Sequence, residues 1–233
     1  MTARLVDWLE AYLARTREQA TTALAVVPLV LVYGFGLMTA SERARSGVDF
    51  VSTRLVSQVP TATYVGLQLG IAFGLCVFAM LRAERPIRDH VRWAWPAIGE
   101  AAAWGLLLGG IVLFLMKEAK ILAIVVSGPF VDRAVLSAGA GLHEELVFRA
   151  GLVPALTWLL SKAIGVPRQA SIVAAVVLSA IAFSGAHHLA GEPFDGFVFL
   201  YRLVAGLVFA SLFLWRGFAI TAWCHAVYDF SVL

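Results

Sequence analysis

Long apolar segments separated by short polar ones make up most of the chain after residue 20. A membrane-crossing helix needs about 20 largely apolar residues, because its rise of about 1.5 Å per residue must cover about 30 Å of hydrocarbon. The segments that fit are Thr22–Thr39, Thr61–Leu81, Pro96–Met116, Ala134–Leu160, Gln169–Ala186, Phe197–Trp215 and Gly217–Leu233. A further apolar stretch, Ile121–Val126, is short and is followed by Ser-Gly-Pro. The pattern therefore predicts seven helices, or eight if that stretch also spans.

The first twenty residues follow a different pattern. Leu5, Trp8, Leu9, Tyr12 and Leu13 recur at helical spacing on one face, and charged residues occupy much of the remainder. This amphipathic pattern predicts a helix that lies in the membrane interface. No short apolar stretch with a small-residue cleavage site precedes it, so no removable signal peptide is expected.

Composition excludes most other classes of protein. Of the 233 residues, 61% are hydrophobic and 14% are charged, whereas a soluble domain has about 45–50% apolar and about 25% charged residues. The net charge of +3 is scattered, without a basic block, so no nucleic-acid-binding surface is expected. The sequence predicts an all-α, polytopic transmembrane helical bundle with the lipid bilayer as its surroundings, in the cell membrane.

Lysines and arginines in short loops predict the orientation. The loop Arg82–Trp95 carries four arginines, whereas His187–Gly196 carries no lysine or arginine. Because cytoplasmic loops are enriched in these residues, the arginine-rich loop and the amino terminus are expected in the cytoplasm. Seven helices then place Lys162 and Arg168 on the same side. The segment Ala40–Pro60, with three arginines, falls on the outer side and counts against this orientation.

Two pairs of glycines spaced four residues apart predict close approach between helices. They are Gly70 with Gly74, and Gly105 with Gly109. A glycine on the surface of a membrane helix lets a neighbouring backbone come near. Both pairs are interpreted as packing positions.

Ionisable residues within the apolar helices concentrate in three segments, Gly141–Arg149, Phe183–His188 and His225–Asp229, while Glu100 and Arg202 are isolated cases near helix ends. A charge at the centre of a membrane helix costs about 2.5–3.5 kcal/mol on insertion scales. The three segments can satisfy one another only by converging, which predicts a polar, water-accessible pocket within the membrane. Acid–base or metal chemistry is favoured, and a proton relay competes with it.

The first of these segments resembles a supported general base. Glu145 and Arg149 are four residues apart, so they share a helix face and can pair. Glu144 projects about 100° away from Glu145 and is free to point into a cavity. A buried ion pair that only fixes helix packing is the alternative interpretation.

The other two segments contribute histidines. Phe183 lies one turn before His187, and His188 points in a different direction from His187, with helix capping as the alternative role. His225 and Asp229 lie one above the other on one face, so Asp229 can orient the imidazole or share in substrate binding. A structural polar clasp remains the alternative for this last pair.

Two other hydrolytic chemistries fit the sequence less well. His143-Glu144-Glu145 resembles the start of H-E-x-x-H, but Val147 stands where the second histidine is needed. The remaining histidines and carboxylates suit zinc by type, so a zinc-dependent protease is kept as a minority alternative and no cofactor is expected. No G-x-S-x-G nucleophile motif is present. Water activated by a carboxylate is the favoured chemistry.

Three motifs in order resemble the CPBP family, also called Abi, of CAAX-protease and bacteriocin-processing intramembrane proteases. They are E-E-x-x-x-R (Glu144, Glu145, Arg149), F-x-x-x-H (Phe183, His187) and H-x-x-x-[N/D] (His225, Asp229). The resemblance covers roughly Ser137–Leu233. It implies a glutamate-type intramembrane endopeptidase, a hydrolase with a helical catalytic core over 134–233. An interfacial helix over 1–20 and membrane helices over 21–133 would precede that core.

The resemblance also implies catalytic roles. Glu144 would activate the water with support from Glu145 and Arg149, and His187 would assist. His225 would form the oxyanion site with the last motif residue.

That last residue, Asp229, departs from the asparagine of the family's prenyl-protein proteases. An ionised aspartate only accepts hydrogen bonds, so Asp229 is expected to orient His225 instead. Phe183 and His188 are the candidates for substrate contact.

The phrase H-E-E-L-V-F-R further resembles a bacterial branch that processes carboxy-terminal sorting or anchor segments of exported proteins. The expected partner is therefore a membrane-anchored protein or peptide, cleaved near its anchored end. Two alternatives from other classes stay open. One is a non-catalytic membrane scaffold or immunity protein, and the other is a proton-coupled transporter. The lack of an inverted repeat counts against transport.

Overall fold

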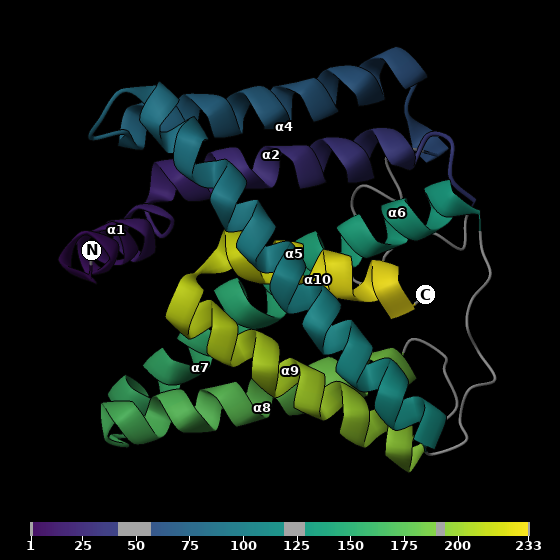
Figure 1. The fold of residues 1–233 in the computed structure, drawn as a ribbon. Coiled ribbons are helices and arrows are strands. Elements are labelled where there is room, and N and C mark those ends of the chain that lie inside the picture. The colour runs from purple at the N-terminus through teal and green to yellow at the C-terminus, as the bar shows by residue number, and fades with distance from the viewer. Residues whose placement is uncertain (1, 42–56, 119–128, 190–193, 233) are drawn as a thin grey trace.

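A computed structural model describes residues 2–41, 57–118, 129–189 and 194–232, and these residues are all-helical, without strands (Figure 1). The elements are α1 (Thr2–Arg15), α2 (Gln19–Gly36), α4 (Thr61–Arg82), α5 (Ile87–Glu118), α6 (Phe130–Gly139), η2 (Ala140–Leu152), α7 (Val153–Trp158), η3 (Leu159–Ala163), α8 (Arg168–Leu189), α9 (Gly196–Arg216) and α10 (Phe218–Val232). Elements α6 to η3 follow one another without a break and form one long helix, of which η2 and η3 are π-helical. The predicted all-α class is confirmed.

Six helices in the described part of the chain are long and apolar enough to cross a membrane. They are α2, α4, α5 over Ile87–Val112, the continuous helix Phe130–Ala163, α8 and α9. The chain is therefore a multi-pass membrane protein. The additional stretch Ile121–Val126 lies outside the described residues. The amino-terminal helix α1 forms as predicted, and its position at the membrane interface stays a prediction.

The last predicted span, Gly217–Leu233, forms a shorter helix than expected. Helix α10 has 15 residues, below the roughly 20 needed to cross the hydrocarbon. It starts directly after Gly217, which has a positive φ of 84° and reverses the chain at the end of α9. Most of α10 is buried against α5, η2, α6 and α9, so its short length is accommodated by protein on several sides.

Two glycines let α10 approach its neighbours at backbone contact distance. A Cβ atom on Gly141 of η2 would lie 2.4 Å from the carbonyl oxygen of Ala222. On the other side, a Cβ on Gly105 of α5 would lie 2.6 Å from the carbonyl oxygen of Cys224. Helix α10 is thus held between η2 and α5 at positions where larger side chains do not fit.

The two glycine pairs predicted from the sequence behave differently. Gly105 and Gly109 both meet α10, the latter at Ser231, so the prediction of close approach is confirmed for this pair. It is wrong for Gly70 and Gly74, which have no described atom within 4 Å of an added Cβ. Spacing alone does not say which face of a helix meets a neighbour, and these two lie on the outer face of α4.

A buried ion pair ties α1 to the rest of the bundle. Arg216, at the end of α9, donates from Nε and Nη2 to Glu100 of α5 at 2.8 and 2.6 Å, and from Nη2 to the Thr16 hydroxyl at 2.9 Å. The Tyr12 hydroxyl donates to the same carboxylate at 2.5 Å. Burial, and then the Glu100 carboxylate, raise the pKa of Tyr12, which therefore stays a protonated donor. The expected isolation of Glu100 is wrong, because its partner is far away in sequence.

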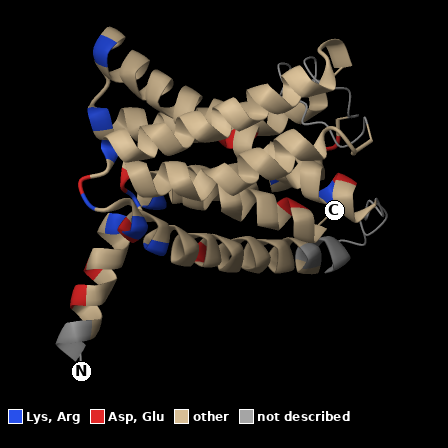
Figure 2. Ribbon diagram, turned by 90° about the horizontal axis from the view of Figure 1, so that it is seen from above, with Lys and Arg blue, Asp and Glu red and all other residues tan. Residues whose placement is uncertain are grey.

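Among the described residues, many of the lysines and arginines lie at one end of the helices (Figure 2). This basic end combines the last residues of α1, α4 and η3 with the first residues of α5 and α8. Its members are Arg15, Arg17, Arg82, Arg85, Arg88, Arg92, Lys162 and Arg168. Contacts across it join Arg85 and His90 to Glu18, and Arg17 to the carbonyl of Leu214. The loops that the sequence assigned to one side of the membrane thus lie together.

Substituting Gly141 tests the close approach of α10. Gly141→Ala is expected to destabilise the protein by about 1–3 kcal/mol, because the added methyl group overlaps the backbone of α10. The matched control is Gly70→Ala, where nothing lies within 4 Å and alanine is the better helix former. Thermal unfolding in detergent should therefore show a lower midpoint for the first variant only. Equal midpoints would contradict the packing described.

Candidate active site

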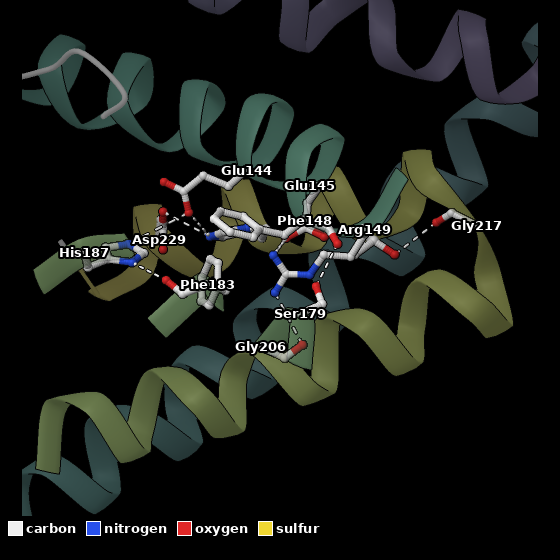
Figure 3. A network of polar contacts seen from close by, with 12 residues as sticks. Glu144, Glu145, Phe148, Arg149, Ser179, Phe183, His187, Gly206, Gly217 and Asp229 are labelled. Carbon is white, nitrogen blue, oxygen red and sulfur yellow. Dashed lines mark hydrogen bonds and ion pairs between the residues drawn. The ribbon is translucent and has the colours of Figure 1, made fainter. Parts of the chain in front are cut away.

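Polar side chains from η2, α8 and α10 meet inside the bundle, and Glu145 lies at their centre (Figure 3). One carboxylate oxygen, Oε1, accepts a hydrogen bond from Nδ1 of His225 at 2.7 Å and lies 3.1 Å from Nη1 of Arg149. All three residues are at most 2% exposed. The predicted convergence of the polar segments is confirmed for these residues, and one carboxylate serves two partners.

The helix that carries both glutamates is π-helical over Ala140–Leu152. The α-helical period predicted from the sequence is wrong for this stretch. Single π-helical turns often occur at functional sites, because the wider turn displaces side chains from their α-helical directions. Glu145 and Arg149 still share a face, while Glu144 points away from them toward α8 and the end of α10 (Figure 3).

Aromatic rings enclose the guanidinium of Arg149. Its Cζ lies 4.3 Å from the ring centre of Phe183, 5.5 Å from that of Phe209 and 5.9 Å from that of Phe148. Its Nη2 donates to the carbonyl of Gly206 at 3.3 Å. Cation–π attraction is stronger where water is excluded, so these rings add to the ion pair in fixing the cation.

The imidazole of His225 is held from several directions. Phe209 stacks on it with ring centres 4.4 Å apart and an angle of 18° between the planes. Its Nε2 lies 3.5 Å from Oδ2 of Asp229, on the side opposite to Glu145. The sequence expectation gave the orienting role to Asp229, but Glu145 makes the shorter contact, from another helix.

The hydrogen bond of His187 defines its tautomer. Its Nδ1 lies 2.9 Å from the carbonyl oxygen of Phe183. Because a carbonyl only accepts, Nδ1 carries a hydrogen, and in the neutral ring Nε2 is an acceptor. That nitrogen faces Oε2 of Glu144 at 3.9 Å. The His187 side chain is 25% exposed, so this part of the cluster reaches the surface.

Glu144 presents one oxygen to both imidazoles. Its Oε2 lies 3.9 Å from Nε2 of His187 and 3.8 Å from Nε2 of His225, too far for direct hydrogen bonds. The same atom is buried and has no hydrogen-bond partner among the described residues. Polar atoms at this separation suit a bridging water. The arrangement can therefore bind a small polar molecule and exchange a proton with it.

The structure does not bring His188 to this cluster. Its ring packs 5.1 Å from that of Phe194 and 6.0 Å from that of Phe199, near the start of α9. Phe183 is 3% exposed and packs against Arg149 and both histidines of the cluster. Substrate contact by His188 and Phe183 stays a prediction.

His143 also lies apart from the cluster. Its ring packs 4.8 Å from that of Tyr33, and its Nδ1 lies 3.0 Å from the carbonyl of Gly139. Within the described ranges, no three histidine, cysteine, aspartate or glutamate side chains are grouped as a metal-ion site. His143, the histidine of the incomplete H-E-x-x-H pattern, therefore does not join His187 and His225, the partners of the two glutamates.

Three residues of the site have no signal in the sequence. Phe209 and Gly206 lie in a predominantly apolar stretch of α9, where nothing distinguishes them from residues that face lipid. Ser179 of α8 donates to the carbonyl of Phe148 at 2.7 Å, which ties α8 to the π-helical segment. A single serine in an apolar helix is too common to indicate this role.

The coupling between Glu145 and Arg149 can be measured by a double-mutant cycle. Glu145→Leu or Arg149→Met alone leaves a buried charge unpaired, and each is expected to cost about 3–5 kcal/mol of unfolding free energy. The double variant should cost less than the sum of the two. The control Arg88→Met, at a side chain 85% exposed, is expected to change stability by less than about 0.5 kcal/mol. Additive losses in detergent unfolding experiments would contradict the pairing.

Comparison with known families matches residues 126–231 to type II CAAX prenyl endopeptidase Rce1-like. No curated protein and no solved structure matches the chain. The matched segment contains Glu144, Glu145, Arg149, His225 and Asp229, which belong to the polar cluster inside the bundle. It begins before the region of sequence resemblance and ends close to the carboxy terminus. Residues 126–231, a little under half of the chain, are thus similar to the Rce1-like type II CAAX prenyl endopeptidases.

Proposed function

We propose that the protein is an intramembrane endopeptidase in which Glu144 activates a water molecule to cleave a peptide bond. The substrate is a protein in the cell membrane, cut near its anchored end. The observation that carries this proposal is the buried Oε2 of Glu144, which has no hydrogen-bond partner among the described residues and faces the Nε2 atoms of two imidazoles at 3.8 and 3.9 Å.

The proposed activation of water depends on two hydrogen-bond acceptors that face each other, the carboxylate of Glu144 and Nε2 of His187. A water between Glu144 and His187 donates one hydrogen to the carboxylate and the other to Nε2 of the neutral imidazole. Both hydrogens are then engaged, and a lone pair of the water oxygen is directed at the substrate. As the oxygen adds to the peptide carbonyl carbon, Glu144 takes the proton.

The developing negative charge on the carbonyl oxygen needs a donor. His225 in its charged form donates from Nδ1 to Glu145, which leaves the Nε2 hydrogen for the oxyanion. Asp229, 3.5 Å from that nitrogen, stabilises the charged ring and accepts rather than donates. Glu144 then passes its proton to the peptide nitrogen, the C–N bond breaks, and a carboxylic acid and an amine leave.

Glu145 and Arg149 lie beneath the reactive side chains and hold them in place. Glu145 and Arg149 are fully buried and make their contacts within the protein, so neither needs to touch the substrate. Glu145 sets the direction of the His225 ring, and Arg149 compensates the charge of Glu145. They are positioning residues in this mechanism, and Phe209 packs against Arg149 and His225.

The substrate class follows from where the cluster lies and from the sequence resemblance. A site inside a membrane bundle acts on chains that reach it through the bilayer, and these are proteins with a hydrophobic anchor. The phrase H-E-E-L-V-F-R is similar to the branch that processes sorting or anchor segments of exported proteins. This resemblance favours an unmodified peptide anchor as the substrate over a prenylated carboxy terminus.

Replacing the proposed base tests the function directly. Glu144→Gln keeps the size of the side chain and removes its ability to take a proton, so cleavage of a membrane-anchored substrate is expected to fall by at least about 10²–10⁴-fold. The matched control Glu84→Gln changes an exposed glutamate between α4 and α5 and should leave cleavage unchanged. Membrane insertion and protein level, measured by immunoblot, should be equal for both variants.

The same experiment separates the alternatives. A phenotype of the gene that survives Glu144→Gln, without any cleaved product in the unsubstituted protein, would indicate a non-catalytic scaffold or immunity protein. Substrate flux that depends on the proton gradient, again without a cleaved product, would indicate a transporter.

Removal of metal ions distinguishes the two hydrolytic mechanisms. Water activated by a carboxylate needs no metal, so cleavage is expected to persist after exhaustive chelation and dialysis. Loss of cleavage that is restored by stoichiometric zinc would contradict the glutamate mechanism and favour the zinc alternative.

A further inference from the structure

An open crevice lies between α2, α4 and the junction of α9 with α10, and its volume is about 600 Å³. Helices α2 and α4 lie side by side along it (Figure 1). The wall on α2 consists of Gln19, Thr22, Ala23 and Val26, whose spacing of three and four residues places them on one face of the helix. Voids in well-packed interiors rarely exceed the size of a water molecule. This space is in the range of ligand-binding pockets, about 300–1,000 Å³.

The crevice changes from polar to apolar along its length. Its lining near the start of α2 includes Arg17, Gln19 and Thr22. Val26 comes seven residues after Gln19, about 10 Å further along the helix. Leu75 of α4 and Phe218 of α10, which also line the crevice, pack against the buried cluster that contains Val26. The inner part is therefore hydrocarbon-like, and the polar part lies at the end of the helices.

Two arginines flank the polar end. Arg17, in the connection between α1 and α2, lines the crevice and donates from Nη2 to the carbonyl oxygen of Leu214 at 3.4 Å. Arg82 is the last residue of α4, and its Cζ lies 5.6 Å from the ring centre of Phe78, a residue of the wall. Both arginines are exposed, and a guanidinium has five N–H donors. Each can therefore bind a further acceptor at the mouth of the crevice.

The neighbouring acidic residues are directed to another arginine. Glu18 follows Arg17 in sequence, but its carboxylate pairs with Arg85 and lies 3.3 Å from Nδ1 of His90. Glu84 also interacts electrostatically with Arg85. The connections 16–18 and 83–86 and residue 217, which surround the mouth, all belong to the described residues. The positive charge is thus a local property of this crevice, whichever side of the membrane it faces.

We propose that the crevice binds one anionic phospholipid, with an acyl chain between α2 and α4 and the phosphate at Arg17 and Arg82. Apolar cavities stay free of water and bind apolar molecules, so a hydrocarbon chain suits the inner part. Guanidinium groups bind phosphate through paired N–H donors, and basic pockets between membrane helices are typical sites for anionic headgroups. A zwitterionic lipid is disfavoured, because its cationic nitrogen would lie beside two arginines.

The proposed lipid reaches the junction of α9 with α10. Gly217 and Phe218 both line the crevice, and no described atom lies within 4 Å of a Cβ added to Gly217. A lipid that fills this space supports the start of the helix that carries His225. The lining contains none of the residues of the proposed catalytic cluster, so the binding can be tested without a substrate.

Native mass spectrometry of the full chain, released from detergent, measures this binding. Phosphatidylglycerol, which is anionic, and phosphatidylcholine, which is zwitterionic, are titrated with identical acyl chains. One bound phosphatidylglycerol per chain is expected, with a Kd at least about tenfold lower than that of phosphatidylcholine, because two arginines contribute to the difference. Equal affinities for the two lipids would indicate ordinary surrounding lipid only and would overturn the proposal.

Substitutions then locate the site. Arg17→Gln and Arg82→Gln are each expected to raise the Kd for phosphatidylglycerol about fivefold and to leave that for phosphatidylcholine unchanged. The matched control Arg88→Gln, at a side chain 85% exposed and outside the lining, should change neither. Thr22→Phe fills the crevice and should weaken binding, whereas Val32→Phe, at an exposed position of α2 outside the lining, should not. Arginine variants that behave like the control would overturn the proposal, even if Thr22→Phe fails to fold.

Two other occupants are distinguished by the same measurement. Inorganic phosphate lacks an acyl chain, so it is expected not to displace phosphatidylglycerol at equal concentration. Displacement by phosphate alone would indicate a site for free anions and overturn the proposed lipid. A second copy of the chain in the crevice would appear as a dimer that Thr22→Phe dissociates, and this result would overturn it as well.

Discussion

The position of the reactive imidazole of His225 depends on the carboxylate of Glu145, which binds Arg149 and His225 at once. Burying an ionised group within a membrane bundle is unfavourable unless its partners are close and well placed. Since none of these three side chains is appreciably exposed, they must satisfy one another. That requirement fixes the distance between η2 and α10, and Gly141 is the position at which the two backbones come close enough to meet it.

Adjacent glutamates divide two tasks that one residue could not perform together. A carboxylate that neutralises an arginine and orients a histidine has little capacity left to take a proton from water. Glu145 makes those contacts, while Oε2 of Glu144 is left without a hydrogen-bond partner among the described residues, within 4 Å of two imidazoles. The π-helical backbone of η2 points the two side chains to different neighbours. Glu145 and Arg149, which support the site, are therefore closed to the surface, whereas the side of the cluster with Glu144 and His187 reaches it.

The sequence predicts the parts of this arrangement that are costly in a membrane. Charges in apolar helices need partners, which is why Glu144, His187 and His225 could be expected to converge. Apolar contacts carry no such signal, so Phe209, which stacks on His225, is indistinguishable from a lipid-facing residue of α9. The π-helical period and the choice of Glu145 rather than Asp229 as the nearer partner of His225 depend on packing between helices distant in sequence.

The polar network around Arg216 lies next to the start of α10, the short helix that carries His225. Helix α10 begins just after Arg216, whose side chain is fixed by Glu100, Thr16 and Tyr12. His225, about two turns after the start of α10, is fixed by Glu145. Only Gly217 separates the fixed Arg216, at the end of α9, from the first residue of α10. Buried polar contacts therefore lie both at the start of α10 and at His225, and the first of them includes Tyr12 of the amino-terminal helix.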